Sequence, residues 1–237
     1  AETENSAPQD LLREANARGL GSVVDRRVVR TLTDWLRAAS DLWREQPAQF
    51  SINLSATSLA DRQFLKFTRA CAENTGLPAG MIAFEIDQQL CRGARRNIQV
   101  LAEELHAIGT GLVIDNFSLH DDSVELLMLP GLRLLKLDRR LTQDAAKSRS
   151  AQAVIAGIAQ MARVAGVHSV AKQVDKTDEF ALLASLGVDF VQSFAGSPPQ
   201  RLDALQADYI RREIVDPAVE DTVVQPRHVP AFLQANE

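Results

Sequence analysis

The chain contains little glycine, little tyrosine and little cysteine, and it has no long apolar run. Twelve glycines and one tyrosine in 237 residues argue against a β-sandwich and against an RNA-binding sheet. Cys71 and Cys91 lie in separate segments without CxxC spacing, which indicates reduced thiols in a cytoplasmic protein. No apolar run is long enough to cross a bilayer, and the first residues, AETENSAPQD, are too polar for a signal peptide.

The overall composition is that of an ordinary folded domain. Hydrophobic residues make up 46% of the chain and charged residues 24%, so the chain can bury a core without disulfides or metals. The formal net charge of −5 disfavours broad attraction to nucleic acid or to an anionic membrane. We therefore expect a protein that neither binds nucleic acid nor inserts into a membrane.

Short apolar segments alternate with segments of helical periodicity along most of the chain. Strands are predicted at 50–55, 81–86, 111–115, 132–137, 168–174 and 188–192. Helices are predicted at 11–43 (two, joined near Gly19 and Gly21), 61–75, 95–108, 122–128, 151–165 and 176–186, and the Asp-Arg-Arg run at 138–140 is interpreted as a solvated helix start. This alternation is typical of α/β folds, in which parallel strands are joined by helical crossovers.

Polar side chains follow the predicted strands at their carboxyl ends. They are Asn53, Glu85, Asp87, Asp115, Asn116, Lys136, Asp138, Lys172 and Gln192. In a (β/α) barrel such positions converge at one mouth, where barrel enzymes keep their chemistry. A doubly wound open sheet is the alternative, but no glycine-rich phosphate loop follows any predicted strand.

These strand-end residues belong to six short motifs in a fixed order. The motifs are NLS (53–55), FEID (84–87), IDNF (114–117), LKLD (135–138), VAKQVD (170–175) and VQSF (191–194). The series resembles the EAL domain, the bacterial cyclic-di-GMP phosphodiesterase family, which has NLS, ExTE, DDFG, LKID, AEGVE and QGY at these places. The resemblance implies a TIM-like (β/α) barrel and, in active members, metal-dependent opening of cyclic-di-GMP to linear pGpG.

The resemblance assigns roles to the matching positions. Asn53, Glu85 and Asp115 match metal ligands, Lys136 matches the lysine that supports the attacking water and the phosphate, with Asp138 beside it, and Gln192 matches the glutamine of QGY. As candidates for ligand binding, the resemblance therefore implies Asn53, Glu85, Asp115, Lys136, Asp138 and Gln192.

Two substitutions depart from the family pattern at positions that active members need. The second aspartate of DDFG is Asn116, which is neutral and offers one weak oxygen ligand. The glutamate of AEGVE is Lys172, a cation that repels a divalent ion and cannot act as a base at neutral pH. The EAL tripeptide is also absent from the chain, so we expect a barrel that is incomplete at its N-terminal edge. Asn116, Lys136 and Lys172 are then vestigial catalytic positions, and Asn53, Glu85 and Asp115 are vestigial metal ligands.

The ends of the chain flank this domain. We expect a frayed tail at 1–9, the degenerate EAL-like domain at 10–200, and a C-terminal helix and extension at 201–237, with a helix at 202–215 and a strand at 220–225.

The predicted function is that of a catalytically inactive module that binds or scaffolds another signalling protein in cyclic-di-GMP signalling. A cyclic-di-GMP receptor without hydrolysis and a weakly active phosphodiesterase are the alternatives, and a homodimer is a further arrangement to test. No cofactor is expected, and Mg²⁺ or Mn²⁺ would be needed only for residual activity.

Overall fold

The computed structural model describes residues 8–45, 48–73, 76, 78–92, 94–174, 176–193, 201–207 and 227–228. The strands are β1 (Phe50–Asn53), β2 (Ile82–Asp87), β3 (Gly111–Phe117), β4 (Leu132–Leu137), β5 (His168–Lys172), β6 (Phe190–Gln192) and β7 (Arg227–His228). The helices are α1 (Pro8–Ala17), α2 (Gly21–Ala38), α3 (Ser40–Glu45), α4 (Ala56–Ala60), α5 (Arg62–Glu73), α6 (Gln88–Cys91), α7 (Arg95–Ala107), α8 (Ser123–Leu126), α9 (Arg139–Asp144), α10 (Arg149–Val164) and α11 (Thr177–Ser185). Residues 202–207 are also helical.

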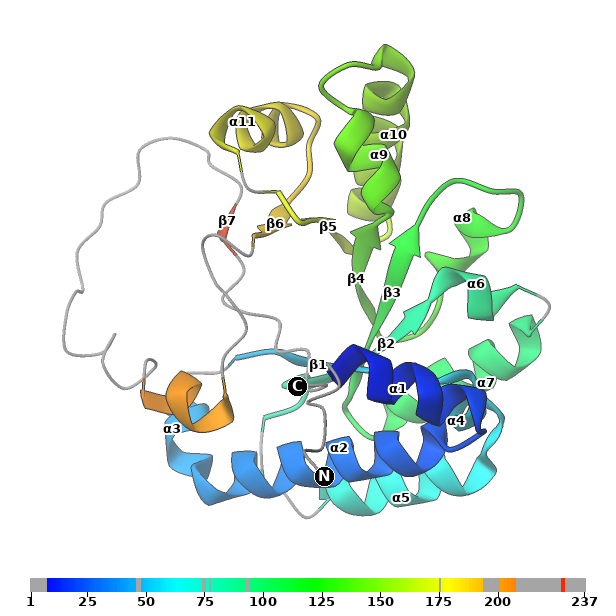
Figure 1. The fold of residues 1–237 in the computed structure, drawn as a ribbon, viewed down its shortest axis with the longest axis vertical. Coiled ribbons are helices and arrows are strands. Elements are labelled where there is room, and N and C mark those ends of the chain that lie inside the picture. Colours follow the sequence, from blue (N-terminus) through cyan, green and yellow to red (C-terminus); the bar gives the residue numbers. More distant parts are fainter. Residues whose placement is uncertain are drawn as a thin grey trace, which may run out of the picture.

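The strands form one sheet in which each strand is parallel to the next and the spatial order equals the sequence order, β1 to β7. Figure 1 shows β1 to β6 along an arc, with helices on its outer side. A doubly wound sheet reverses its strand order at a switch point, and this sheet does not. The prediction of a barrel-type α/β fold is confirmed, and the strands build a curled half-barrel.

The two faces of the sheet carry different side chains, because successive residues of a strand point to opposite faces. Phe84, Ile114 and Leu135 belong to the large apolar core that includes the helices. Their neighbours Ala83, Val113, Leu134 and Val170 form a separate small cluster. That second cluster marks the concave face, which also carries the polar side chains of the candidate site.

The predicted strands are found within a few residues of their expected bounds. The short helices α4 and α6 were not predicted, and α3 was not predicted as an element separate from the helical run that ends at residue 43. Helix α3 begins directly after Ala39, and helices α4 and α6 begin after the N-cap residues Ser55 and Asp87. Strand β5 ends at Lys172, earlier than expected, because Gln173 adopts a φ of 55°, which is incompatible with a strand.

The two tryptophans of the chain lie together beside β1. The ring centroids of Trp35 and Trp43 are 4.9 Å apart, and the ring of Phe50 lies 5.7 Å from the first and 5.3 Å from the second. Trp43 and Phe50 are buried. This aromatic cluster joins α2 and α3 to the first strand, at the outer side of the sheet.

Several expectations concern the ends of the chain. Helix α1 begins at Pro8, inside the segment expected to be a tail. The C-terminal helix expected at 202–215 is helical at 202–207, and its remainder, the strand expected at 220–225 and Phe194 lie outside the described residues. Within the described part of the chain, no helix combines the length and the apolar character needed to cross a membrane.

Candidate functional site

The carboxyl ends of the strands bring the predicted polar residues together. Asn53 lies in register with Glu85 on the neighbouring strand, and Lys172 lies in register with Gln192. Asp115 pairs with Asp87, the second acid of FEID. The gathering at one end of the sheet follows from parallel strands and confirms the placement predicted from the sequence.

Glu85 and Lys136 form a buried ion pair on the concave face. The Lys136 ammonium contacts Glu85 Oε2, and their side chains are 0% and 1% exposed. Ser51 Oγ donates a second hydrogen bond to the same oxygen at 3.1 Å, while Glu85 Oε1 is buried without a hydrogen-bond partner. Burial raises the pKa of Glu85; Lys136 opposes this, and the charge of Asp115 adds to it.

Lys172 binds the two polar residues of the β3 motif IDNF. Its ammonium contacts Asp115 Oδ1 and donates a hydrogen bond to Asn116 Oδ1 at 2.7 Å. The amide nitrogen of Asn116 donates in turn to Asp87 Oδ2 at 2.7 Å. One lysine therefore joins β5 to β3, and the asparagine extends the connection to β2.

Each of these lysine pairs spans a strand that lies between its partners. Glu85 on β2 meets Lys136 on β4 across β3, and Asp115 on β3 meets Lys172 on β5 across β4. Side chains on alternate strands are too far apart in a flat sheet but share layers inside a (β/α) barrel. The two pairs are thus a direct consequence of the curvature of the half-barrel.

The backbone at this site departs from regular strand geometry. The register between β3 and β4 shifts between Ile114 and Phe117, and Asn116 has a φ of 54°. Asparagine tolerates this left-handed region better than most residues other than glycine. The shift turns the side chains of both Asp115 and Asn116 toward Lys172.

Asp138 completes the mouth next to this cluster. It caps helix α9 by accepting from the backbone nitrogen of Arg140 at 2.8 Å, and its Oδ2 accepts from Arg140 Nη2 at 2.7 Å. The hydrogen bonds from Arg140, opposed by burial and aided by the charge of Lys172, hold the pKa of Asp138 below its usual value. The predicted helix start at 138–140 is confirmed.

The residues at the mouth do not fit a pair of divalent ions. A metal ion at the end of β3 would need the oxygens of Asp115 and Asn116, and the Lys172 ammonium already contacts both. A doubly charged ion about 4 Å from an ammonium meets a repulsion of roughly 8 kcal/mol at an effective dielectric constant of about 20. Asn53 and Glu85 remain, and the Glu85 carboxylate is paired with Lys136.

Sequence reasoning did not single out the residues that support this site from behind. Asp25 on α2 is 6% exposed, and its Oδ2 accepts from Ser55 N at 2.8 Å, Ser55 Oγ at 2.7 Å and Ser58 Oγ at 2.7 Å. These bonds fix the turn that follows Asn53. The useful sequence signal was an acid at a core position of an amphipathic helix, which requires a buried partner.

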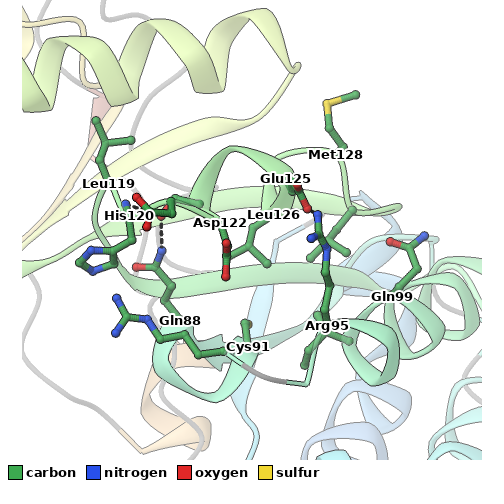
Figure 2. A pocket seen from close by; sticks show the side chains of 15 residues that line it. Gln88, Cys91, Arg95, Gln99, Leu119, His120, Asp122, Glu125, Leu126 and Met128 are labelled. Carbon is green, nitrogen blue, oxygen red and sulfur yellow. Dashed lines mark hydrogen bonds and ion pairs between the residues drawn. The ribbon is translucent and has the colours of Figure 1, made fainter.

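A groove of about 780 Å³ lies beside the site, between α6, α7, α8 and the loop 118–122 (Figure 2). Two of the side chains that line the groove are apolar and exposed: Leu119 is 39% exposed and Met128 76%. An ion pair between Arg95 and Glu125 connects α7 to α8 within the groove. Apolar side chains left exposed along a groove make it a candidate contact surface.

Gln88 fastens the loop that forms one wall of this groove. Its amide nitrogen donates to the carbonyl oxygen of Ser118 at 3.0 Å and to Ser123 Oγ at 2.8 Å, and its amide oxygen accepts from the Ser118 backbone nitrogen at 2.9 Å. Figure 2 shows Gln88 below the loop, with one hydrogen bond of its side-chain amide dashed. Gln88 lines the groove, and the preceding residue, Asp87, is bound to Asn116 in the Lys172 cluster (Lys172, Asp115, Asn116 and Asp87). The groove and this cluster are therefore joined by adjacent residues of the backbone.

The cysteines take no part in this chemistry. Both are free thiols among the described residues, and Cys91 is buried under the groove. Burial, with a smaller contribution from the charge of Asp87, raises the pKa of Cys91 to about 11. At neutral pH this thiol is protonated and therefore a poor nucleophile.

Comparison with known proteins identifies related sequences. The family model described as "EAL domain" matches residues 2–199. The cyclic di-GMP phosphodiesterase PdeB of Shewanella oneidensis is 24% identical over 196 residues, which are 83% of this chain and 23% of the relative. The cyclic di-GMP phosphodiesterase PA2567 of Pseudomonas aeruginosa is 28% identical over 192 residues, 78% of this chain and 32% of the relative. The chain thus spans less than a third of these relatives' length.

Solved structures share the fold. The FimX EAL domain of Xanthomonas citri in complex with c-di-GMP superimposes with a TM-score of 0.74 at 24% identity, covering 84% of this chain and 78% of that one. The PaMucR phosphodiesterase in its c-di-GMP complex gives a TM-score of 0.75 at 23% identity, covering 86% and 83%. At these identities the likeness establishes the architecture alone.

Proposed function

Because this chain belongs to the EAL domain family, we propose that it is a non-catalytic member that acts by binding another protein in cyclic-di-GMP signalling. The observation that carries the proposal is the contact of the Lys172 ammonium with Asp115 Oδ1 and Asn116 Oδ1. In active members the resemblance places carboxylates and divalent ions at these positions. Here an ammonium occupies the same oxygens, so the Asp115 carboxylate is already neutralised and is not available to hold a divalent ion that would stabilise a phosphate transition state.

The groove between α6, α7 and α8 is the surface that supports a protein-binding role. Its exposed apolar residues Leu119 and Met128 line a hollow that also contains Arg95 and Glu125. Apolar contacts with a rim of both charge signs are what protein interfaces use. The proposed occupant is another signalling protein, and a second copy of this chain is the alternative that a molar-mass measurement tests.

A receptor for cyclic-di-GMP is the second candidate function. Two structural neighbours carry c-di-GMP in their complexes. In this chain, the mouth of the half-barrel contains Lys136, Lys172 and Gln192. Both lysines are held by carboxylates, however, and would have to exchange those partners for phosphate. This cost favours the protein-binding role over the receptor role.

The test is a turnover and binding assay on the purified chain. It is incubated with cyclic-di-GMP and excess Mg²⁺ or Mn²⁺, and the products are separated by chromatography, with an active EAL phosphodiesterase as positive control. We expect no pGpG and, in calorimetry, no tight nucleotide binding. Metal-dependent turnover would refute the proposal in favour of an enzyme, and sub-micromolar binding without turnover would establish the receptor instead.

The place of action is part of the same proposal. Free thiols at Cys71 and Cys91 are compatible with a reducing compartment. We therefore expect the protein in the cytoplasm. Fractionation of cells that express the full-length protein, followed by detection of the protein in each fraction, tests this expectation.

A further inference from the structure

A continuous series of polar contacts leads from Lys172 to the wall of the groove. The Lys172 ammonium holds Asp115 and the side-chain oxygen of Asn116, and the side-chain nitrogen of Asn116 holds Asp87. Asp87 is the N-cap of α6 and accepts from the backbone nitrogen of Gln89 at 2.7 Å. The position of the lysine is therefore linked to the start of α6.

The next residue continues the series into the loop 118–122. Gln88 uses both ends of its amide on the loop, donating to Ser118 O and Ser123 Oγ and accepting from Ser118 N. Ser123 Oγ also donates to Ser118 O at 2.8 Å and accepts from the backbone nitrogen of His120 at 2.8 Å. The loop is thus closed on itself and fastened to α6 by one buried side chain.

The backbone on both sides of the Lys172 contact is bent. Asn116 has a φ of 54° and Gln173 a φ of 55°, both in the left-handed region. Such conformations persist only where surrounding contacts hold them. The Lys172 side chain ties one bend to the other, because it leaves β5 directly before Gln173 and ends on Asn116.

From this arrangement we propose that Lys172 is a tethered cation: its ammonium bridges β3 and β5 in place of a bound metal ion and keeps the groove wall in one conformation without any divalent cation. The inference rests on the proposed function, because it explains how a site unfit for metal still organises the binding surface. It goes further by stating that the binding surface is constitutively formed and indifferent to Mg²⁺ and Mn²⁺.

The physical basis is the similarity between an ammonium and a small cation as partners for oxygen. An ammonium has three donors that can be directed to separate acceptors, here a carboxylate and an amide oxygen on one strand. Unlike a free ion, it cannot dissociate from the chain. Removing it would leave Asp115 and the Asn116 oxygen without their cationic partner, and oxygen groups of this kind attract a divalent ion.

The experiment compares wild type with Lys172→Met, which keeps the length of the side chain and removes the charge. Hydrogen exchange of the amides at 118–123 is measured by mass spectrometry with EDTA and with excess Mn²⁺. We expect exchange about tenfold faster in Lys172→Met with EDTA and a return toward the wild-type rate, with a raised melting temperature, in Mn²⁺. Wild type should show the same exchange in EDTA and in Mn²⁺.

Two further variants make the test specific. Lys176→Met makes the same change in charge four residues away, at an exposed lysine that pairs with Glu179, and should leave the loop exchange unchanged. Asn116→Gly keeps the left-handed bend but removes the link between Lys172 and Asp87, and should speed the same amides. This second variant gives an independent answer if Lys172→Met does not fold.

The outcomes separate this inference from the proposed function. Unchanged loop exchange in Lys172→Met or Asn116→Gly would overturn the tethered cation even if the chain has no turnover. Slower loop exchange of wild type in Mn²⁺ would overturn it as well, because it would show a metal acting where the lysine should suffice. Turnover of cyclic-di-GMP would instead refute the proposed function, and is measured separately.

Discussion

Replacing Lys136 by methionine should destabilise the protein strongly, and increasingly so as the pH rises. Both members of the Glu85–Lys136 pair are buried, at 1% and 0% exposure. Lys136→Met retains most of the apolar stem but removes the charge that accompanies the Glu85 carboxylate. The carboxylate then keeps only the hydrogen bond from Ser51, at 3.1 Å.

The size of the effect follows from the burial of the charge that is left behind. Breaking a buried ion pair by removing one partner costs about 3–5 kcal/mol, because the remaining charge is not compensated. The hydrogen bond from Ser51 to the Glu85 carboxylate contributes roughly 1.5–3 kcal/mol. It is present both in wild type and in Lys136→Met, so it does not reduce the difference in stability between them. Against a total stability of about 5–15 kcal/mol, the loss would be a large fraction of the whole.

The pH dependence has a defined sign. Burial raises the pKa of Glu85, and Lys136 partly offsets that increase. Without Lys136 the pKa of Glu85 rises further. A carboxyl group whose pKa is raised by folding adds stability below its unfolded pKa, and this is lost as pH rises through the folded pKa. The deficit of Lys136→Met should therefore be smaller near about pH 5 than near about pH 8.

The assay is urea unfolding followed by far-ultraviolet circular dichroism at both pH values. The control is the double variant Glu85→Gln/Lys136→Met, in which neither side chain is charged; its stability should be closer to wild type and should depend less on pH. A loss below about 1 kcal/mol for Lys136→Met, or a loss that does not change with pH, would show that Glu85 is not a buried, compensated carboxylate.

Two other substitutions probe the backbone around the site. Asp25→Ala removes the acceptor of three hydrogen bonds from Ser55 and Ser58 and leaves buried donors unsatisfied, so the free energy of unfolding should fall by about 2–3 kcal/mol; Asp25→Asn should lose less, and equal stability of Asp25→Ala and wild type would contradict the role of Asp25. Gln173→Gly should raise the free energy of unfolding by up to about 1 kcal/mol, because glycine adopts the φ of 55° without strain; a loss of stability in urea unfolding would show that the Gln173 side chain makes a stabilising contact.

The sequence specified the elements of the fold better than their contacts. Apolar runs such as LRLLKL located β4 to the residue, whereas α3, α4 and α6, with six, five and four residues, are too short to show helical periodicity. The end of β5 could not be predicted either, because a left-handed glutamine has no signature in the sequence.

The candidate site was predicted as a set of positions but not as a set of partners. Parallel strands place their carboxyl ends on one side, so the location of Glu85, Asp115 and Lys172 at one mouth followed from the topology. That Lys172 contacts Asp115, two strands away, depends on the curvature of the sheet and on the bulge at Asn116. The order of the motifs along the sequence predicts which strands are neighbours. It does not predict contacts between side chains that lie two strands apart, which only the three-dimensional structure shows.

The aromatic cluster beside β1 determines which part of the molecule tryptophan fluorescence monitors. Both tryptophans lie in it, 4.9 Å apart, and Trp43 also contacts Phe50 on the first strand. Their emission therefore responds to one corner of the domain, where α2 and α3 meet the sheet. Opening at the Lys172 cluster or in the groove would leave the fluorescence unchanged. A fluorescence transition that coincides with the circular dichroism transition would thus establish that the corner and the mouth unfold together, and a later fluorescence transition would reveal a half-barrel that opens from its mouth first.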